Sequence, residues 1–193
     1  MSSHAARRTS AAQPRETRWC AARKLFVENG YAQTSTPDVV AAANVSRGAL
    51  YHHFADKQAL LWAVLELELA EVRRAIEEAT PSGLAPRQAL IAGSLAYLDA
   101  MAVAGRTRLL LVEGPAVFGH SAMAKLDATS AAGALQEGLR AALGDHPTVS
   151  ALANLLSAAF DHAALAITDG ADAAVYRAAM LTLIERVVAE SKS

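Results

Sequence analysis

The side chains best suited to chemistry lie between residues 34 and 57, and the chemistry they suit is hydrogen bonding to DNA. Arg47 can donate paired hydrogen bonds to a guanine, while Gly48 and Ala49 are small enough to let the backbone approach base edges. The other polar side chains of the segment suit contacts with phosphates. The residues that we expect to contact DNA are Thr34, Ser46, Arg47, Gly48, Ala49, Tyr51, His52 and Lys57.

Two short helices joined by a tight turn would position these side chains. Val39 and Ala43 lie on one apolar face of the first helix. Asn44 tolerates left-handed backbone geometry and predicts the turn, and Ser46 can cap a second helix over residues 47–53. In helix-turn-helix proteins the second helix enters the major groove and presents its N-terminal side chains to the bases. The segment therefore predicts a helix-turn-helix unit.

Each polar residue of the segment also has an ordinary structural interpretation. Taken singly, Tyr51 reads as a half-buried aromatic, Lys57 as a solvated side chain and Arg47 as a surface charge. Their joint placement favours DNA binding. His52 and His53 point about 100° apart on a helix, and no other ligand is spaced to complete a metal site. We expect no metal and no cofactor.

The charge distribution separates the N-terminal third of the chain from the rest. Net charge is −1 over 193 residues, but residues 1–60 carry eight basic and four acidic groups while residues 61–193 carry ten basic and fifteen acidic groups. A basic segment of this kind fits a polyanionic partner. The composition is 53% hydrophobic and 5% aromatic, rich in Ala and Leu, which predicts a folded all-α protein.

We expect three parts along the chain: a flexible basic arm over residues 1–13, a three-helix helix-turn-helix domain over 14–58, and a helical body over 59–193. Cys20 is a single cysteine and can form no internal disulfide. The N-terminus lacks the apolar region of a signal peptide, and the apolar runs read as too short and interrupted to span a membrane. These observations predict a cytoplasmic protein.

Helical periodicity predicts about nine helices, with short or kinked ones between Arg106 and His120, where Gly114, Pro115 and Gly119 interrupt an apolar run. A long helix from Asp56 to Thr80 is apolar on two flanks. The remaining predicted helices cover residues 14–29, 34–43, 86–104, 121–143, 147–168 and 172–190. Gly30 is expected to end the first of these helices and Asp172 to cap the last, and Phe54 is expected to be buried.

The N-terminal pattern resembles the tetracycline-repressor-like (TetR) transcriptional regulators over about one quarter of the chain. The resemblance is carried by the LF pair at residues 25–26, the GY at 30–31, the block VSRGALYHHF at 45–54, and the DK at 56–57. Asn44 departs from the family's usual Gly and Val40 from its usual Ala, and Pro37 is not the common choice. Asn can adopt the same left-handed turn, so the fold is little affected.

The resemblance implies a regulator, expected to be a repressor, that binds a near-palindromic DNA operator as a homodimer and is released by a small-molecule effector. One helix-turn-helix domain reads only a few base pairs, so specificity also requires two such domains. The last two helices, over about 147–168 and 172–190, are expected to pair with their copies. The effector is expected to be small and largely apolar, in a pocket that includes Tyr97, Arg108, Glu113, His120, Phe160, Asp161 and His162.

Two other classes of function compete with this interpretation. An enzyme could use the region of Glu113, Asp161 and His162, but no phosphate loop, nucleophile signature or metal spacing supports it. A helical protein-interaction module would need no DNA, and the basic N-terminal segment counts against it. We therefore predict a DNA-binding regulator that is not an enzyme.

Overall fold

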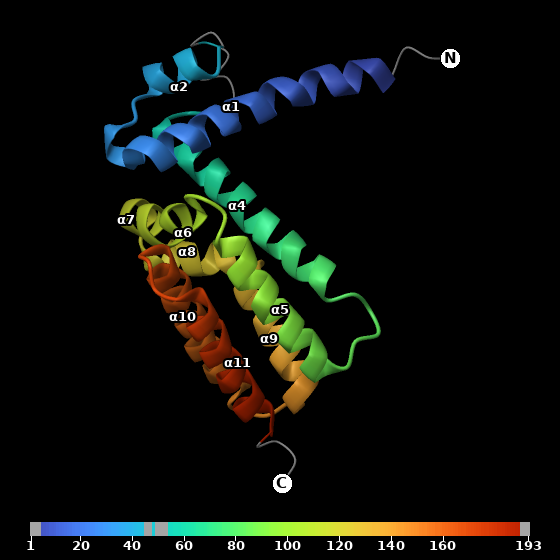
Figure 1. Cartoon of the computed structure of the whole chain (residues 1–193). Helices are drawn as coiled ribbons and strands as arrows, with labels where there is room; N and C mark the ends of the chain where they lie inside the picture. Colours follow the sequence, from blue (N-terminus) through green and yellow to red (C-terminus); the bar gives the residue numbers. More distant parts are fainter. Residues whose placement is uncertain (1–4, 45–47, 49–53, 190–193) are drawn as a thin grey trace. The chain divides into compact units, whose positions relative to one another are not determined.

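The computed structural model describes residues 5–44, 48 and 54–189, and for residues 5–18 it describes the course of the backbone only. Every regular element within these ranges is a helix, which confirms the predicted all-α class (Figure 1). The chain divides into two compact units, residues 1–67 and 68–193, named here the head and the body. The division falls inside helix α4, Lys57–Ala79, and thus later than the predicted boundary at residue 58.

The first helix of the head, α1, runs over Ala5–Gln33 and is interrupted at Gly30, where φ is 77° and ψ is 165°. A glycine was expected to end this helix, and a positive φ is the reason that glycine suits the position. The helix begins at Ala5, within the stretch over residues 1–13 where a flexible arm is expected from the sequence. Ala, Arg and Gln dominate this stretch and are good helix formers.

The second helix, α2, covers Thr36–Ala42 and begins with a complete capping box. The Ser35 hydroxyl accepts from the Asp38 amide at 3.3 Å, while the Asp38 carboxylate accepts from the Ser35 amide at 2.8 Å. Such reciprocal bonds satisfy two of the amides that a helix start leaves unpaired. Just beyond the helix, Asn44 has a φ of 51°, which confirms the left-handed turn predicted there.

The core of the head explains why the unit extends into α4. Phe26 and Val39 are fully buried, and Phe54 is buried as predicted. Four apolar residues in the first turns of α4, Leu60, Leu61, Val64 and Leu65, are also almost completely buried. Each side chain of this size contributes about 1.5–3 kcal/mol when it is removed from water. This part of α4 therefore belongs with the head.

The body is a bundle in which α5, α9, α10 and α11 pack side by side (Figure 1). Their bounds are Pro86–Met101, Ala131–Leu143, Val149–Thr168 and Ala173–Ala189. The buried residues that they share are Leu90, Leu98, Leu139, Val149, Ala153, Leu156, Phe160, Ala163, Met180 and Ile184. The predicted cap of the last helix is confirmed, because the Asp172 carboxylate accepts from the Ala174 amide at 2.8 Å.

Between α5 and α8 the chain forms a bent helical segment, as the glycine and proline pattern predicts. It consists of α6, Arg106–Arg108, the π-helical stretch η1, Leu109–Glu113, and α7, Gly114–Phe118. If Arg106–Phe118 is taken as one element, the described residues contain nine helices, in agreement with the predicted number.

The single helix predicted over residues 121–143 is wrong, because the chain forms two. Helix α8 covers His120–Asp127 and α9 begins at Ala131. The Asp127 carboxylate accepts from the Ala131 amide at 3.2 Å, and Ser130 donates its hydroxyl to the Leu69 carbonyl of α4 at 2.8 Å. Asp and Ser compete with helical hydrogen bonding through such side-chain contacts, which accounts for the break.

Helix α10 is long and apolar enough to cross a bilayer, whereas the sequence predicted only apolar runs too short and interrupted for this. Its residues Leu156, Phe160 and Ala163 are buried in the core of the body. A helix in the core of a folded protein can be as long and as apolar as one that spans a membrane.

Candidate functional site

The candidate DNA-contacting segment of the head is described only in part. Ser46, Arg47, Ala49, Tyr51 and His52 lie outside the described residues. Gly48 is exposed, and a Cβ added there would meet no other atom within 4 Å among those described. Neither crowding nor a positive φ within the described head therefore requires glycine at this position.

The predicted hydroxyl contact of Thr34 with DNA is not supported by its position. The side chain is 1% exposed, and its hydroxyl donates to the Gly30 carbonyl at 2.8 Å and the Leu25 carbonyl at 3.2 Å. These bonds supply a donor to carbonyl groups near the interruption of α1 at Gly30. Thr34 thus acts inside the head, and the neighbouring Ser35 is the residue that caps α2.

Lys57 is half-buried at the start of α4, where it holds the end of α1. Its Nζ donates to the Tyr31 carbonyl at 2.8 Å and lies 4.0 Å from the centroid of the Tyr31 ring. Burial, together with the negative charge of Asp56, raises the pKa of the Tyr31 hydroxyl. An ammonium group has three donors, so this bond leaves Lys57 able to make a further contact. The cation–π partner Tyr31 was not predicted from the sequence.

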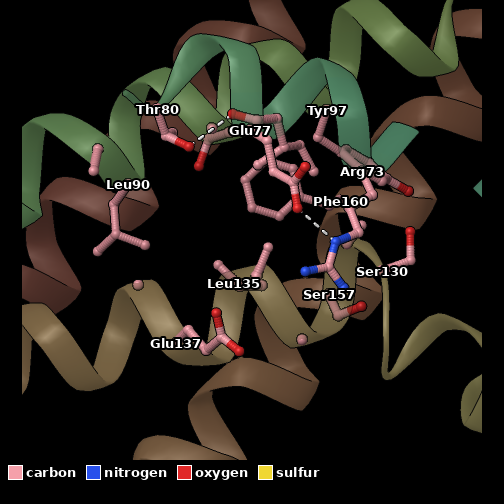
Figure 2. A pocket seen from close by; sticks show the side chains of 18 of the residues that line it. Arg73, Glu77, Thr80, Leu90, Tyr97, Ser130, Leu135, Glu137, Ser157 and Phe160 are labelled. Atoms are coloured by element: carbon pink, nitrogen blue, oxygen red, sulfur yellow. Dashed lines mark hydrogen bonds and ion pairs between the residues drawn. The ribbon is translucent and has the colours of Figure 1, made fainter. Parts of the chain in front are cut away.

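The body contains a cavity of about 550 Å³ between α4, α5 and α9, named here the α4–α9 cavity. Figure 2 shows that its walls carry Leu90 of α5, Leu135 of α9 and Phe160 of α10. Arg73 of α4 lies at the cavity and pairs with Glu77 at 2.6 Å. The volume lies in the range of small-molecule sites in proteins.

A second cavity of about 420 Å³ lies between α4, α5, α8 and α10, named here the acidic cavity. Asp127 and Asp161 both line it, and Tyr97 lines both cavities. Tyr97 donates its hydroxyl to Asp161 at 2.6 Å, and its ring contacts that of Phe160 edge-on, with the centroids 5.6 Å apart. The bond fixes the tyrosine at the junction of the two cavities.

Burial shifts the pKa values of three polar groups that line the acidic cavity, Asp127, Asp161 and Tyr97. It raises the pKa of Asp127 to about 6, with a further contribution from the negative charge of Asp161. Burial also raises the pKa of Asp161, against the effect of the Tyr97 hydrogen bond. The pKa of Tyr97 is raised by burial and by the Asp161 carboxylate. Two carboxylates facing an apolar space oppose each other's ionisation.

Most of the predicted pocket residues do line one of these cavities. Tyr97, His120, Asp161 and His162 line the acidic cavity, and Phe160 lines the α4–α9 cavity. The other two predicted pocket residues lie outside both cavities. Arg108 and Glu113 line neither cavity, and they pair with each other at 3.1 Å.

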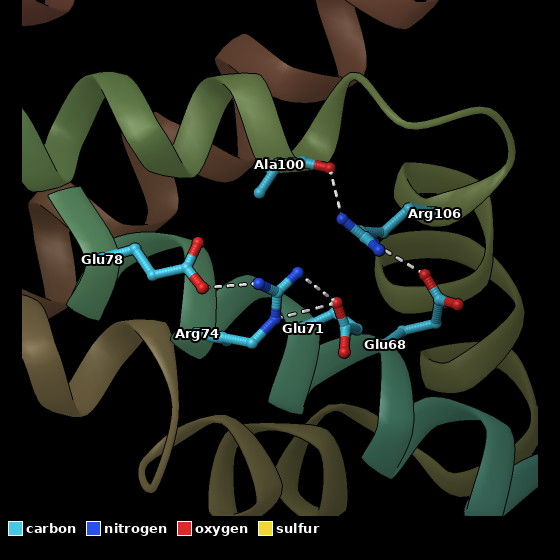
Figure 3. A network of polar contacts seen from close by, with 6 residues as sticks. All are labelled: Glu68, Glu71, Arg74, Glu78, Ala100 and Arg106. Carbon is cyan, nitrogen blue, oxygen red and sulfur yellow. Dashed lines mark hydrogen bonds and ion pairs between the residues drawn. The ribbon is translucent and has the colours of Figure 1, made fainter.

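Several polar residues of the body were missed from the sequence. Glu68 and Arg106 form a buried ion pair at 2.6 Å, and Arg106 also donates to the Ala100 carbonyl at 2.8 Å (Figure 3). Glu68 lies next to Leu69 within the apolar part of α4, and a charged residue at such a position could have been predicted to need a buried partner. Asp127 could have been found as a cap residue before a new helix.

Apolar side chains are exposed on the last two helices. Leu155 of α10 is 69% exposed, and Val175 and Leu183 of α11 are 62% and 45% exposed. Ala151 and Ala158 are also exposed and lie on the same side of α10 as Leu155, at helical spacing. Contiguous apolar patches of this kind mark interaction surfaces.

Comparison with known proteins assigns both units of the chain. Residues 20–64 match the bacterial regulatory proteins of the tetR family, and residues 87–190 match the tetracyclin repressor-like C-terminal domain. The regulator UidR of Escherichia coli is 42% identical over 71 residues, which are 34% of this chain and only 36% of that relative.

Two solved structures extend the similarity to most of the chain. A TetR-family transcriptional regulator from Pectobacterium atrosepticum is 30% identical, with a TM-score of 0.66, over 91% of this chain and 94% of its own. LfrR of Mycobacterium smegmatis, solved with proflavine, is 20% identical with a TM-score of 0.65 over 91% and 96%. The chain belongs to the TetR family of bacterial transcription regulators.

Proposed function

We propose that the protein is a ligand-responsive repressor that binds a near-palindromic operator as a homodimer in the cytoplasm. The observation that carries the proposal is the capped helix α2 followed by the left-handed turn at Asn44. This geometry directly precedes the segment 47–53, which we assign to the major groove. TetR-family regulators are DNA-binding proteins and not enzymes, which agrees with the predicted class.

Within the head we assign separate roles to the residues that meet DNA. Arg47 reads a base, and Gly48 and Ala49 permit the backbone to approach. Tyr51, His52 and Lys57 contact phosphates, together with the hydroxyl of Ser46, and fix the register. Lys57 is supported by its position, since its bond to Tyr31 holds the ammonium group in place.

We propose that the dimer forms through α10 and α11. The support is the exposed apolar surface of Leu155, Val175 and Leu183 in a single chain. Two helices from each protomer would form a four-helix interface, in which a two-fold axis pairs each patch with its copy. Such a dimer supplies two heads to the two half-sites of an operator.

We propose that the effector binds in the body. Both cavities are large enough for a small molecule and are lined mostly by apolar side chains, and the related fold of LfrR is known in complex with proflavine. An effector releases DNA only if it prefers one state of the protein over the other. Helix α4 lines both cavities and also contributes to the core of the head. It is therefore our candidate for the element that couples effector binding in the body to DNA binding by the head.

The test is fluorescence anisotropy of labelled promoter DNA titrated with the purified protein at several salt concentrations. We expect affinity to fall steeply with salt, because phosphate contacts release counterions. Gly48→Ala is the sharpest variant, since an added Cβ meets nothing in the described head. It should keep the melting temperature and lower DNA affinity at least about tenfold, whereas unchanged affinity would show that the assigned face is wrong.

A further inference from the structure

Ser94 of α5 carries a buried hydroxyl that makes no hydrogen bond in the part of the chain that the structure describes. The residue is 6% exposed and lines the α4–α9 cavity. Buried side-chain hydroxyls in folded proteins are almost always paired, because the loss of water is costly without a replacement partner. An unpaired hydroxyl at the wall of a ligand-sized cavity is therefore a position where a ligand atom would complete the bonding.

The surroundings of Ser94 are apolar and lack bulk. Ile76, Leu90 and Phe160 supply apolar walls to the cavity, and Gly93 and Gly138 line it without side chains. A Cβ at Gly138 would approach Leu90 to 2.8 Å, so this glycine lets α9 pack closely against α5. Small residues thus keep the space open, and the apolar part of the wall favours a largely apolar ligand.

The charged groups of this cavity do not compete for the ligand's polar atom. Arg73 donates to Glu77 and also to the Thr129 carbonyl, both at 2.6 Å (Figure 2). Glu137 also lines the cavity but is exposed to solvent. The cation that lines the cavity is thus already held by Glu77 and the Thr129 carbonyl, so it offers an ionised ligand group little compensation for the desolvation that opposes binding.

We infer that the α4–α9 cavity binds an uncharged, largely apolar molecule whose hydroxyl or carbonyl group pairs with Ser94 Oγ. A serine hydroxyl both donates and accepts, so either ligand group satisfies it. The inference rests on the proposed effector function of the body and specifies its chemistry. It assigns recognition of the polar end to Ser94 and of the apolar part to the walls.

Isothermal titration calorimetry on the full-length chain tests the inference with three probes of one shape. These are 2-naphthol, 2-methylnaphthalene and 2-naphthoate, which carry a neutral hydroxyl, a methyl group and a carboxylate. The wild-type chain should bind 2-naphthol about three- to tenfold more tightly than 2-methylnaphthalene, as one net hydrogen bond predicts, and 2-naphthoate most weakly. Ser94→Ala should abolish the preference for 2-naphthol.

The same variant gives a second readout without ligand. Ser94→Ala removes an unpaired buried hydroxyl and places a better helix former in α5, so its melting temperature should rise. The matched control is Ser150→Ala on α10, which makes the same change of helix former but loses an exposed hydrogen bond from Gln136, so its melting temperature should rise less than that of Ser94→Ala. Higher stability combined with lower affinity for 2-naphthol is the signature of a hydroxyl reserved for a ligand.

Three results would overturn the inference: no binding of 2-naphthol to the wild-type chain, an undiminished preference for 2-naphthol in Ser94→Ala, or a lower melting temperature of that variant. DNA binding is measured separately on the same samples. A chain that binds 2-naphthol through Ser94 but binds no DNA refutes the proposed regulator and leaves this inference standing. If the chain binds DNA and Ser94→Ala leaves the preference for 2-naphthol unchanged, the inference alone is refuted.

Discussion

The hydroxyl of Tyr97 donates a 2.6 Å hydrogen bond to the carboxylate of Asp161, and this bond joins α5 to α10 where the two cavities of the body meet. Because Tyr97 lines both cavities, a change in its position would alter both at once. The bond is thus a point at which a bound ligand can act on the packing of the bundle.

Tyr97→Phe should lower the free energy of unfolding by about 1–3 kcal/mol at pH 7, because the Asp161 carboxylate loses its donor while it stays buried. The pKa of Asp161 is already raised in the folded state, and loss of the bond raises it further. Protonation then relieves the penalty, so the destabilisation should be smaller at pH 5. Urea unfolding at both pH values measures this, with Tyr176→Phe as the control. Equal losses at both pH values would contradict the role of the carboxylate.

Asp127→Asn should stabilise the protein at pH 7, by on the order of 1–2 kcal/mol. The folded protein holds the Asp127 proton up to a pKa of about 6, against 3.8 for a free carboxyl. The folded state therefore binds more protons than the unfolded state between these values, and stability falls as pH rises through that window. Unfolding curves from pH 3.5 to 7.5 should show this slope in the wild type and a weaker one in the variant. The control Asp145→Asn, which changes an exposed carboxyl, should leave the wild-type slope of stability against pH unchanged.

Arg106→Met should destabilise the body by about 3–5 kcal/mol, because it leaves the buried Glu68 carboxylate without its cationic partner. The double variant Glu68→Met, Arg106→Met should recover most of the loss. Arg74→Met is the matched control, since Arg74 pairs with Glu71 and Glu78 at the surface and should cost at most about 1 kcal/mol (Figure 3). Guanidinium unfolding of all three variants measures the difference. A double variant as unstable as the single one would show that the ion pair itself is needed.

Leu155→Glu should convert the proposed dimer to monomers without unfolding the chain, because the side chain is 69% exposed in a single chain. Sedimentation velocity measures the mass, and DNA affinity should fall with the loss of the second head. Leu84→Glu is the control, since Leu84 is 38% exposed and lies between α4 and α5. Dimers that persist in Leu155→Glu would place the interface elsewhere.

Local sequence signals predicted much of the fold. Asn44 and Asp172 have side chains that favour one local geometry, and both positions were predicted correctly. The break at residues 128–130 was missed because it depends on a partner distant in sequence, the Leu69 carbonyl that accepts from Ser130. Helix periodicity carries no information about such a contact.

The candidate sites divide in the same way. The segment that we propose to contact DNA is contiguous in sequence, so the prediction could rest on its residue types and spacing alone. The cavities assemble side chains from four or more separate segments, and Asp127 and Ser94 become distinctive only through burial. The burial of Thr34 could not be predicted, because a threonine beside a helix start looks the same in sequence whether its hydroxyl faces solvent or the core.

The most direct measurement of the central claim is selection of bound sequences from random double-stranded DNA with the purified full-length chain. A dimer that presents two equivalent heads should recover a near-palindrome, with half-sites separated by about one helical turn or a multiple of it. Arg47→Ala should recover the same spacing with relaxed preference at one base of each half-site. Recovery of no enriched motif, or of a single half-site without symmetry, would contradict the dimeric operator-binding account.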